Sequence, residues 1–291
     1  MESRFKLQYE QYRQAVEEYL RSCFQAEAPQ KVLFDSMRYS LLAGGKRLRP
    51  IFVYDFCRMC SGAWSEATPF AAAIEMIHTY SLIHDDLPCM DDDDFRRGKL
   101  TNHKVYGEAT AVLAGDALLT AAFTTLTQAD LPADVCIQAV RILAECAGEL
   151  GMVGGQILDI QSEQRLCTEQ EVLDIQMRKT GALIRAACML GVLAGNGSSQ
   201  QLESAARFAD YLGLAFQIRD DMLDVIGDAQ LLGKNVGVDT VKNTFVQLYG
   251  LDRCDVLVRE YTDKAIVILK NQFSDSSFME YLSGWLTGRT L

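Results

Sequence analysis

The segment Asp85-Asp86-Leu87-Pro88-Cys89-Met90-Asp91 ends a predicted helix of residues 69–86 and runs on into Asp92-Asp93-Asp94. Pro88 prevents this helix from simply continuing, so we expect Asp91 to return toward Asp85 from a turn or a distorted helix end. Adjacent carboxylates repel one another unless cations neutralise them. The segment is therefore predicted to bind multivalent cations.

A second acidic cluster lies inside residues 202–226, where apolar residues nearly surround a predicted helix. Gln217, Asp220, Asp221 and Asp224 fall at helical spacing on one stripe of this helix. Desolvating such carboxylates is unfavourable unless they are paired, so a cation is needed there. Oxygen ligands without Cys or His favour Mg²⁺, which takes one or two carboxylates and completes its shell with water and phosphate.

The composition limits the fold and the partners. The chain has 291 residues, of which 49 % are hydrophobic, and only five prolines, with long apolar patterns at helical spacing. Sustained period-two alternation is absent, so we expect an all-α protein with a single domain over residues 1–291. The formal net charge of -11 argues against a nucleic-acid partner, because binding phosphate backbones needs a surplus of Lys and Arg.

The cysteines and the N-terminus favour a reduced, cytoplasmic protein. Nine cysteines lack framework spacing, and Met1-Glu2-Ser3-Arg4 leads into charged residues rather than an apolar signal region. Cys57 and Cys60 form one Cys-x-x-Cys without a partner at zinc spacing, so we interpret both as ordinary buried cysteines. No apolar run reaches the roughly 18 residues of a membrane span.

A basic segment follows the predicted helix of residues 31–42. Gly44-Gly45 gives backbone freedom, and Lys46-Arg47-Leu48-Arg49-Pro50 comes directly after it. This segment fits an anion clamp, but such cations also complement a helix C-terminus, and both interpretations stay open. It is not a Walker P-loop, because the glycine spacing and the following Ser or Thr are missing.

Polar groups near the first acidic cluster also have two interpretations each. His78 precedes Asp85 by seven residues, so both side chains should point from one face, either as ligands or with His78 as a satisfied interior group. Arg96 and Arg97 suit bidentate contacts with phosphate, but they could instead pair with the neighbouring acids. Residues 92–94 are expected to be solvated.

A third polar group precedes a long apolar run. Lys179 and Thr180 stand where a buried cation and hydroxyl need partners. Gln156 and Asp159 share one face of the predicted helix of residues 133–164 and are interpreted as supporting polar groups.

Carboxylates that bind Mg²⁺, with Lys and Arg around them, suit a diphosphate, and apolar helix walls suit a hydrocarbon tail. Together they predict ionisation of a carbon–oxygen bond with diphosphate leaving, inside a dry cavity that protects a carbocation from water.

Five ordered motifs resemble those of the trans-isoprenyl diphosphate synthases, most closely the bacterial-type farnesyl diphosphate synthases, over nearly the whole chain. The motifs are Gly44-Gly45-Lys46-Arg47-Leu48-Arg49-Pro50, Asp85-Asp86-x4-Asp91 with Arg96-Arg97-Gly98, Gly115-Asp116-Ala117-Leu118-Leu119, Lys179-Thr180-Gly181 and Phe216-Gln217-x2-Asp220-Asp221-x2-Asp224. The resemblance implies a helical bundle around a central active-site cavity, a homodimer, and three Mg²⁺ ions on the allylic diphosphate.

The resemblance also implies roles for the matched residues. The principal metal ligands would be Asp85, Asp91 and Asp220, with support from Asp86, Asp221 and Asp224. Isopentenyl diphosphate would be held by Lys46, Arg49, His78 and Arg97. The allylic dimethylallyl or geranyl diphosphate would be held by Arg96, Lys179, Lys234 and Gln217. Thr180 and Gln217 would lie beside the developing cation, and the released diphosphate would take the final proton.

Product length is implied by Tyr80, five residues before Asp85 and about 7.5 Å along the helix. In similar enzymes an aromatic residue there closes the floor of the cavity, which favours a C15 product over C20 or C10, although Tyr80 could be ordinary core. Two departures concern loops only: Leu100 replaces a common Pro, and Phe245-Val246 replaces a Tyr-Pro pair.

Three rival functions share part of this pattern. A terpene cyclase has the acidic motif but needs no second diphosphate site, which would leave Lys46, Arg49 and Arg97 unexplained. A non-catalytic subunit of a prenyl synthase usually loses acidic residues, whereas both motifs are whole here. A structural Mg²⁺-binding protein does not account for the basic groups.

Overall fold

The computed structural model describes residues 3–61, 63–163, 165–232 and 243–289. Its residue contacts form two compact units: an N-terminal unit of Glu2–Arg141 and Leu190–Asn196, and a C-terminal unit of Ile142–Met189 and Gly197–Leu291. The regular elements in the described ranges are helices apart from one short hairpin, so the all-α prediction is confirmed. The expectation of one domain around a central cavity stays a prediction.

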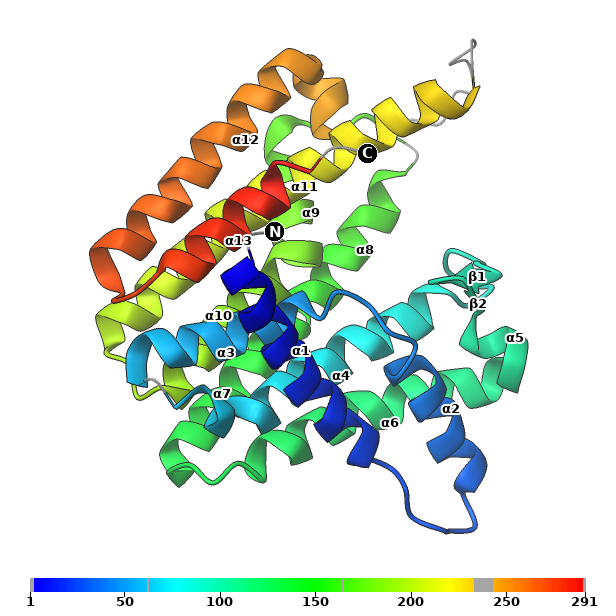
Figure 1. Cartoon of the computed structure of the whole chain (residues 1–291). Helices are drawn as coiled ribbons and strands as arrows, with labels where there is room; N and C mark the ends of the chain where they lie inside the picture. Colours follow the sequence, from blue (N-terminus) through cyan, green and yellow to red (C-terminus); the bar gives the residue numbers. More distant parts are fainter. Residues whose placement is uncertain (1–2, 62, 164, 233–242, 290–291) are drawn as a thin grey trace. The chain divides into compact units, whose positions relative to one another are not determined.

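The N-terminal unit is built around helix α4, which packs against α3 and α6 (Figure 1). No side chain from residue 70 to residue 77 is more than 2 % exposed. A helix buried on nearly every side needs apolar residues almost all round, and the one charged residue of this segment, Glu75, is paired with Arg47. The unit's helices are α1 (Ser3–Ser22), α2 (Lys31–Leu41), α3 (Leu48–Ser61), η1 (Trp64–Ala67), α4 (Thr68–Asp85), α5 (Asn102–Tyr106), α6 (Glu108–Thr127) and the first part of α7 (Ala133–Ala147).

A two-stranded antiparallel hairpin follows the first acidic cluster. Strand β1 (Phe95–Arg96) pairs with β2 (Lys99–Leu100) across a turn in which Arg97 has φ 53° and Gly98 has φ 74°. Positive φ at both central residues is typical of a two-residue type I′ turn. The sequence did not predict these strands, because two residues are too few to produce a period-two pattern.

The C-terminal unit is centred on α11, which lies side by side with α12 and α13 (Figure 1). Leu214, Ile218 and Met222 of α11 share an apolar core with Phe245 and Leu257 of α12. The predicted capping box of Thr168 and Glu171 is present at the start of α9. The unit's helices are the end of α7, α8 (Met152–Ser162), α9 (Glu169–Gln176), the π turn η2 (Met177–Gly181), the first part of α10 (Ala182–Ala194), α11 (Ser199–Leu232), α12 (Phe245–Gln272) and α13 (Ser277–Thr287).

The single helix predicted for residues 133–164 is wrong in one respect, because the chain breaks it into α7 and α8. Gly151 caps α8 with φ -114° and ψ -126°, far from helical values. A Cβ atom at this position would lie 2.0 Å from the carbonyl oxygen of Cys146, so the break requires glycine.

By length and composition alone, α6 would qualify as a membrane span, the one such helix in the described ranges. Within its unit α6 packs against α4 and α2 and buries Ala111, Ala114, Leu118 and Ala122. Core helices of this composition pass the same test, so α6 is weak evidence for a span.

Candidate active site

A basic pocket of about 350 Å³ lies in the N-terminal unit. Its wall contains Lys46, Arg49, His78 and Arg97, the four side chains expected to hold isopentenyl diphosphate. They come from the loop before α3, the first turn of α3, the middle of α4 and the turn of the hairpin. The structure therefore brings together four residues from three separate stretches of the chain.

The electrostatics of this pocket favour an anion. The Nε atom of Arg49 is buried and has no hydrogen-bond partner in the described part of the chain. Burial lowers the pKa of the Arg49 guanidinium, and the nearby carboxylate of Glu75 opposes that shift. An anion that enters the pocket would supply the missing acceptor for Arg49 and gain a charge-assisted hydrogen bond.

His78 is neutral in this environment. Burial, followed by the guanidinium charges of Arg49 and Arg97, holds the pKa of His78 well below its usual 6.5. A neutral imidazole can still donate one hydrogen bond to a phosphate oxygen. Its place in the pocket wall favours the ligand interpretation over that of a purely interior histidine.

Arg97 reaches this pocket across the α2–α3 loop, where its guanidinium donates to the carbonyl oxygen of Gly44. A Cβ atom on Gly45 would lie 2.8 Å from the Arg97 guanidinium carbon, so a side chain there would displace Arg97. Gly45 thus leaves room for an arginine from the hairpin, while Gly44 has open space around it and is favoured by its positive φ of 87°.

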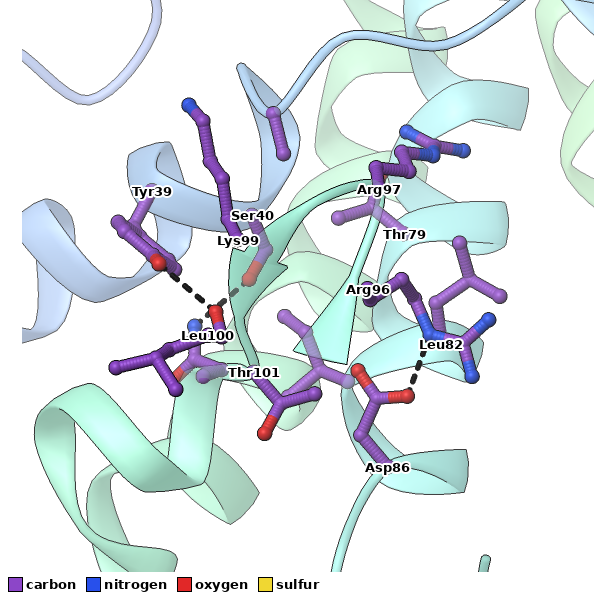
Figure 2. A pocket seen from close by; sticks show the side chains of 13 residues that line it. Tyr39, Ser40, Thr79, Leu82, Asp86, Arg96, Arg97, Lys99, Leu100 and Thr101 are labelled. Atoms are coloured by element: carbon purple, nitrogen blue, oxygen red, sulfur yellow. Dashed lines mark hydrogen bonds and ion pairs between the residues drawn. The ribbon is translucent and has the colours of Figure 1, made fainter. Parts of the chain in front are cut away.

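The first acidic cluster closes on itself as the sequence predicted. The Asp91 amide donates to the carbonyl oxygen of Asp85 at 2.9 Å, so the turn after α4 brings Asp91 back to the helix end. Arg96 donates to Asp86 Oδ1 at 2.5 Å (Figure 2). It also donates to Asp93 Oδ2 at 3.0 Å. The pairing interpretation therefore holds for Arg96.

Residues 92–94 are only partly as predicted. Asp92 and Asp94 are exposed, but Asp94 forms an ion pair with Lys104 at 2.6 Å. Burial raises the pKa of Asp86, which is 3 % exposed, although its bond with Arg96 opposes that shift. A carboxyl with this burial needs a cation beside it, and Arg96 supplies one.

In the C-terminal unit, a chain of hydrogen bonds joins three predicted site residues. Thr180 Oγ1 donates to Gln217 Oε1 at 3.3 Å, and Gln217 Nε2 donates to Asp221 Oδ1 at 3.0 Å. The amide of Phe245 donates to the second Asp221 oxygen at 2.9 Å. Burial raises the pKa of Asp221, and these neutral donors oppose the shift, so its carboxylate is held in a fixed orientation.

Lys179 lies in the π turn η2 and forms an ion pair with Asp159 of α8 at 2.5 Å. A Cβ atom on Gly155 would lie 2.3 Å from the Lys179 amide nitrogen, so this glycine allows α8 to approach the turn. Asp159 therefore has the supporting role expected from the sequence. π turns are frequent at functional sites, because they re-aim side chains within a helix.

Arg289 is a site residue that the sequence analysis missed. Its guanidinium donates to Asp220 Oδ1 at 2.7 Å and stacks over the Phe216 ring at 4.5 Å from the ring centroid. It follows α13 as a single arginine with no neighbouring motif, so nothing in the local sequence marks it. Asp224 of the same acidic stripe is exposed.

Lys234 lies outside the described residues. In the described ranges no group of three or more His, Cys, Asp or Glu side chains could by itself hold a metal ion. Each acidic motif nevertheless presents hard oxygen donors, and Mg²⁺ needs only one or two carboxylates when substrate phosphates complete its shell. The donor chemistry therefore fits Mg²⁺.

Tyr80 is 6 % exposed on α4, with its ring edge-to-face against His84 at 5.8 Å between centroids. This burial suits both a cavity floor and an ordinary core residue. All nine cysteines are free thiols; Cys57 is buried, whereas Cys60 is only half-buried.

Comparison with known proteins gives consistent matches. A farnesyl diphosphate synthase of Micrococcus luteus is 45 % identical over 243 residues, which cover 83 % of this chain and 84 % of that protein. A geranylgeranyl diphosphate synthase of Cyanophora paradoxa is also 45 % identical over 243 residues, covering 80 % of this chain and 81 % of the relative. The crystal structure of an FPP/GFPP synthase from Zymomonas mobilis matches with a TM-score of 0.90 at 34 % identity, over 98 % of this chain and 100 % of that one.

The profile of the family described as Polyprenyl synthetase matches residues 30–281, which contain every predicted site residue. With these relatives and the ordered motifs, the match shows that the chain belongs to the polyprenyl synthetase family of trans-prenyltransferases.

Proposed function

We propose that the protein is a farnesyl diphosphate synthase. It joins isopentenyl diphosphate head to tail to dimethylallyl diphosphate and then to geranyl diphosphate, by ionisation, condensation and elimination. The observation that carries this proposal is the basic pocket, where Lys46, Arg49, His78 and Arg97 form one wall. A terpene cyclase has no use for a second diphosphate site, and a non-catalytic subunit has no use for whole acidic motifs.

The cofactor in this proposal is Mg²⁺, with three ions in the active site. Asp85, Asp91 and Asp220 would be the principal ligands, supported by Asp86, Asp221 and Asp224. When bound, the ions neutralise the charge that develops on the departing diphosphate. Asp86 lies beside the guanidinium of Arg96 and Asp220 beside that of Arg289, so Mg²⁺ would compete with these guanidinium groups for the carboxylate oxygens.

The allylic diphosphate would be held by Arg96, Lys179 and Lys234. Thr180 and Gln217 would face the developing cation with their oxygen dipoles, and the hydrogen bond between them at 3.3 Å keeps these oxygens in a defined arrangement. Preorganised dipoles of this kind stabilise charge without reorganising during the reaction.

For product length we propose C15, with Tyr80 as the floor of the hydrocarbon cavity. A C20 product is the alternative, since farnesyl and geranylgeranyl synthases are equally similar to this chain. Replacing Tyr80 by Ala should shift the products toward C20 in product chromatography. An unchanged C15 product from that variant would contradict the floor assignment.

A homodimer in the cytoplasm completes the proposal. Val112 and Leu113 of α6 and Ile137 of α7 are 39 %, 58 % and 69 % exposed. Apolar side chains left exposed on α6 and α7 are available for contacts with a second chain. Sedimentation equilibrium tests this assembly, because a dimer should give a molar mass twice that of the single chain.

The reaction is tested by incubating the purified protein and Mg²⁺ with geranyl diphosphate, with and without labelled isopentenyl diphosphate. We expect a labelled C15 diphosphate only when both substrates are present. Turnover of geranyl diphosphate at the same rate with and without isopentenyl diphosphate would instead identify a cyclase. No turnover of either substrate would favour a non-catalytic subunit.

A further inference from the structure

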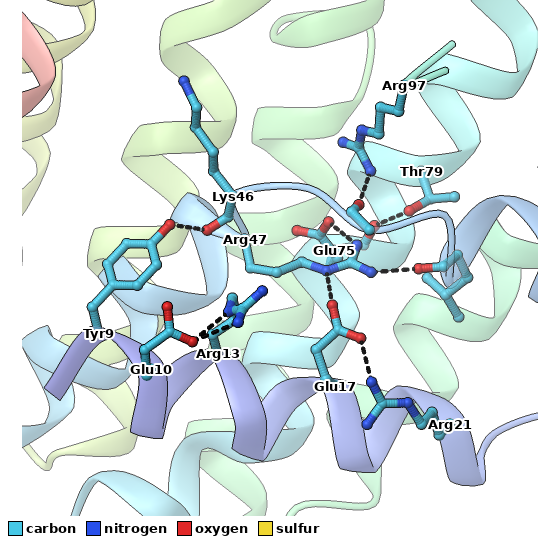
Figure 3. A network of polar contacts seen from close by, with 12 residues as sticks. Tyr9, Glu10, Arg13, Glu17, Arg21, Lys46, Arg47, Glu75, Thr79 and Arg97 are labelled. Atoms are coloured by element: carbon cyan, nitrogen blue, oxygen red, sulfur yellow. Dashed lines mark hydrogen bonds and ion pairs between the residues drawn. The ribbon is translucent and has the colours of Figure 1, made fainter. Parts of the chain in front are cut away.

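Arg47 differs from the cations beside it in the sequence, because its guanidinium is turned into the protein. Its side chain is 0 % exposed. Nε donates to Glu17 Oε1 at 2.9 Å, Nη1 donates to Glu75 Oε1 at 2.6 Å, and Nη2 donates to the carbonyl oxygen of Leu41 at 2.8 Å (Figure 3). Arg47 and Glu75 also line the basic pocket, but every nitrogen of the Arg47 guanidinium is engaged by protein oxygens, so it is not placed to hold a diphosphate.

These bonds tie one loop to three helices. Glu17 belongs to α1, Leu41 ends α2 and Glu75 lies in α4. On either side of the Arg47 side chain, the backbone is fixed as well. Tyr9 Oη donates to the carbonyl oxygen of Lys46 at 2.5 Å, and the carbonyl oxygen of Arg47 accepts the Ile51 amide at 3.1 Å, which starts α3.

The backbone of Arg47 is in the left-handed region, with φ 52°. Residues other than glycine rarely adopt this conformation, and it persists only where the surroundings over-determine it. The three guanidinium bonds provide that restraint. In this conformation Lys46 of the loop and Arg49 of the first turn of α3, on either side of Arg47, lie in the wall of the basic pocket.

Glu75 is the other half of this arrangement. It is 2 % exposed and lies one helical turn before His78, so both face the same side of α4. A buried carboxylate without a partner is strongly unfavourable, and so is a buried guanidinium, so Glu75 and Arg47 depend on one another. The charge of Glu75 also acts on Arg49 and Arg97, where it opposes the effect of their burial on the pKa.

We propose that Arg47 and Glu75, completed by Glu17, form a positioning unit for the isopentenyl diphosphate site. None of the three contacts the substrate in this proposal. They hold the α2–α3 loop so that Lys46 and Arg49 meet the diphosphate in the correct geometry. The inference rests on the proposed function, and it predicts that the unit controls the use of isopentenyl diphosphate but not the ionisation of the allylic substrate.

The test compares Arg47→Gln with a matched control, Arg58→Gln. Arg58 also pairs with a buried carboxylate, Asp55 at 2.8 Å, but it lies near the other end of α3 and does not line the basic pocket. We expect Arg47→Gln to raise KM for isopentenyl diphosphate about 10- to 100-fold, because small misplacements of binding groups have effects of this size. KM for geranyl diphosphate and its hydrolysis without isopentenyl diphosphate should stay within about twofold of wild type.

Arg58→Gln should leave both KM values unchanged while lowering the melting temperature, which isolates the structural effect of losing a buried pair. Arg47→Lys keeps the charge but not the planar fork, so its KM for isopentenyl diphosphate should lie between the values of wild type and Arg47→Gln. If Arg47→Gln leaves KM for isopentenyl diphosphate unchanged, or if both variants raise all kinetic constants alike, the positioning role is refuted.

Two further measurements test the positioning role if Arg47→Gln does not fold or if the wild-type protein shows no prenyl transfer. If Arg47→Gln does not fold, Glu17→Gln is the milder variant, because it leaves the Arg47–Glu75 bond in place, and it should raise the same KM by a smaller factor. If the wild-type protein shows no prenyl transfer, the proposed function fails. Calorimetric binding of inorganic pyrophosphate then tests the loop directly, and equal affinity of wild type and Glu17→Gln would refute the positioning role.

Discussion

The basic pocket and the acidic stripe of α11 are assembled in opposite ways. The pocket collects Lys46, Arg49 and Arg97 from a loop, a helix start and a hairpin turn, with positive φ at Arg47 and Arg97. The stripe places Gln217, Asp220 and Asp221 on one regular helix. A site built on one helix depends on periodicity, whereas a site built from loops depends on every contact that holds those loops.

The two regions also hold their charges differently. Arg47 and Glu75 neutralise one another inside the N-terminal unit, with both side chains nearly inaccessible to water. On α11, Asp221 is held by the neutral donors Gln217 and Phe245, while Asp220 faces Arg289 in a half-exposed pair. Substitutions in the pocket should therefore alter substrate binding, and those on the stripe should alter metal-dependent chemistry.

The largest effect is expected from Asp220→Asn, which removes a proposed metal ligand without changing the helix. A bound metal contributes several kcal/mol to stabilising the leaving charge, so kcat should fall about 100-fold or more. The exposed Asp263 of α12 provides the control, since Asp263→Asn should be silent in the same steady-state assay. Normal activity in Asp220→Asn would show that the stripe is not a metal face.

The next effect is expected from Arg49→Gln in the pocket. Losing one hydrogen bond to a charged group costs about 1.5–3 kcal/mol, which corresponds to an increase in KM for isopentenyl diphosphate of about 10- to 100-fold. KM for geranyl diphosphate should not change. The control is Arg13, an exposed arginine of α1. Arg13→Gln should match wild type in KM for isopentenyl diphosphate and in KM for geranyl diphosphate. An equal increase in both KM values would show that Arg49 does not act on isopentenyl diphosphate alone, and the basic pocket would then not be specific to that substrate.

His78 gives a smaller, pH-dependent effect. Its folded-state pKa is well below 6.5, so on acidification the unfolded chain takes up a proton that the folded protein does not. Stability should therefore fall as the pH drops below 6.5, by at most about 1.4 kcal/mol per pH unit, the limit for one proton. Melting temperatures at pH 7.5 and 5.5 should decrease less for His78→Gln than for wild type. An identical decrease in the melting temperatures of both proteins would contradict the assignment of a neutral, buried His78.

The smallest effect is expected from Arg289→Gln. The Arg289–Asp220 pair has side chains that are 16 % and 34 % exposed, so it contributes on the order of 0.2–1 kcal/mol. Mg²⁺ competes with this guanidinium for Asp220, and the variant should bind Mg²⁺ about two- to fivefold more tightly in calorimetry without substrate. Weaker Mg²⁺ binding in the variant would instead mean that Arg289 supports the metal site.

The amino-acid sequence by itself determined the helices and the acidic stripe. The apolar pattern of α4 and α11, the capping box at Thr168 and the turn that returns Asp91 to Asp85 all follow from local periodicity and backbone chemistry. Such features involve residues only a few positions apart, so the chain's own geometry fixes them.

Only the tertiary structure decided how the charges are partnered. Arg47 and Glu75 are 28 positions apart and Asp220 and Arg289 are 69 positions apart, and no local pattern links them. The need for Gly155 beside Lys179 and for Gly45 beside Arg97 likewise depends on atoms brought close by folding. A sequence shows which residues could carry charge, but the partner of each buried charge is set by packing, because only packing determines which polar groups lose water together.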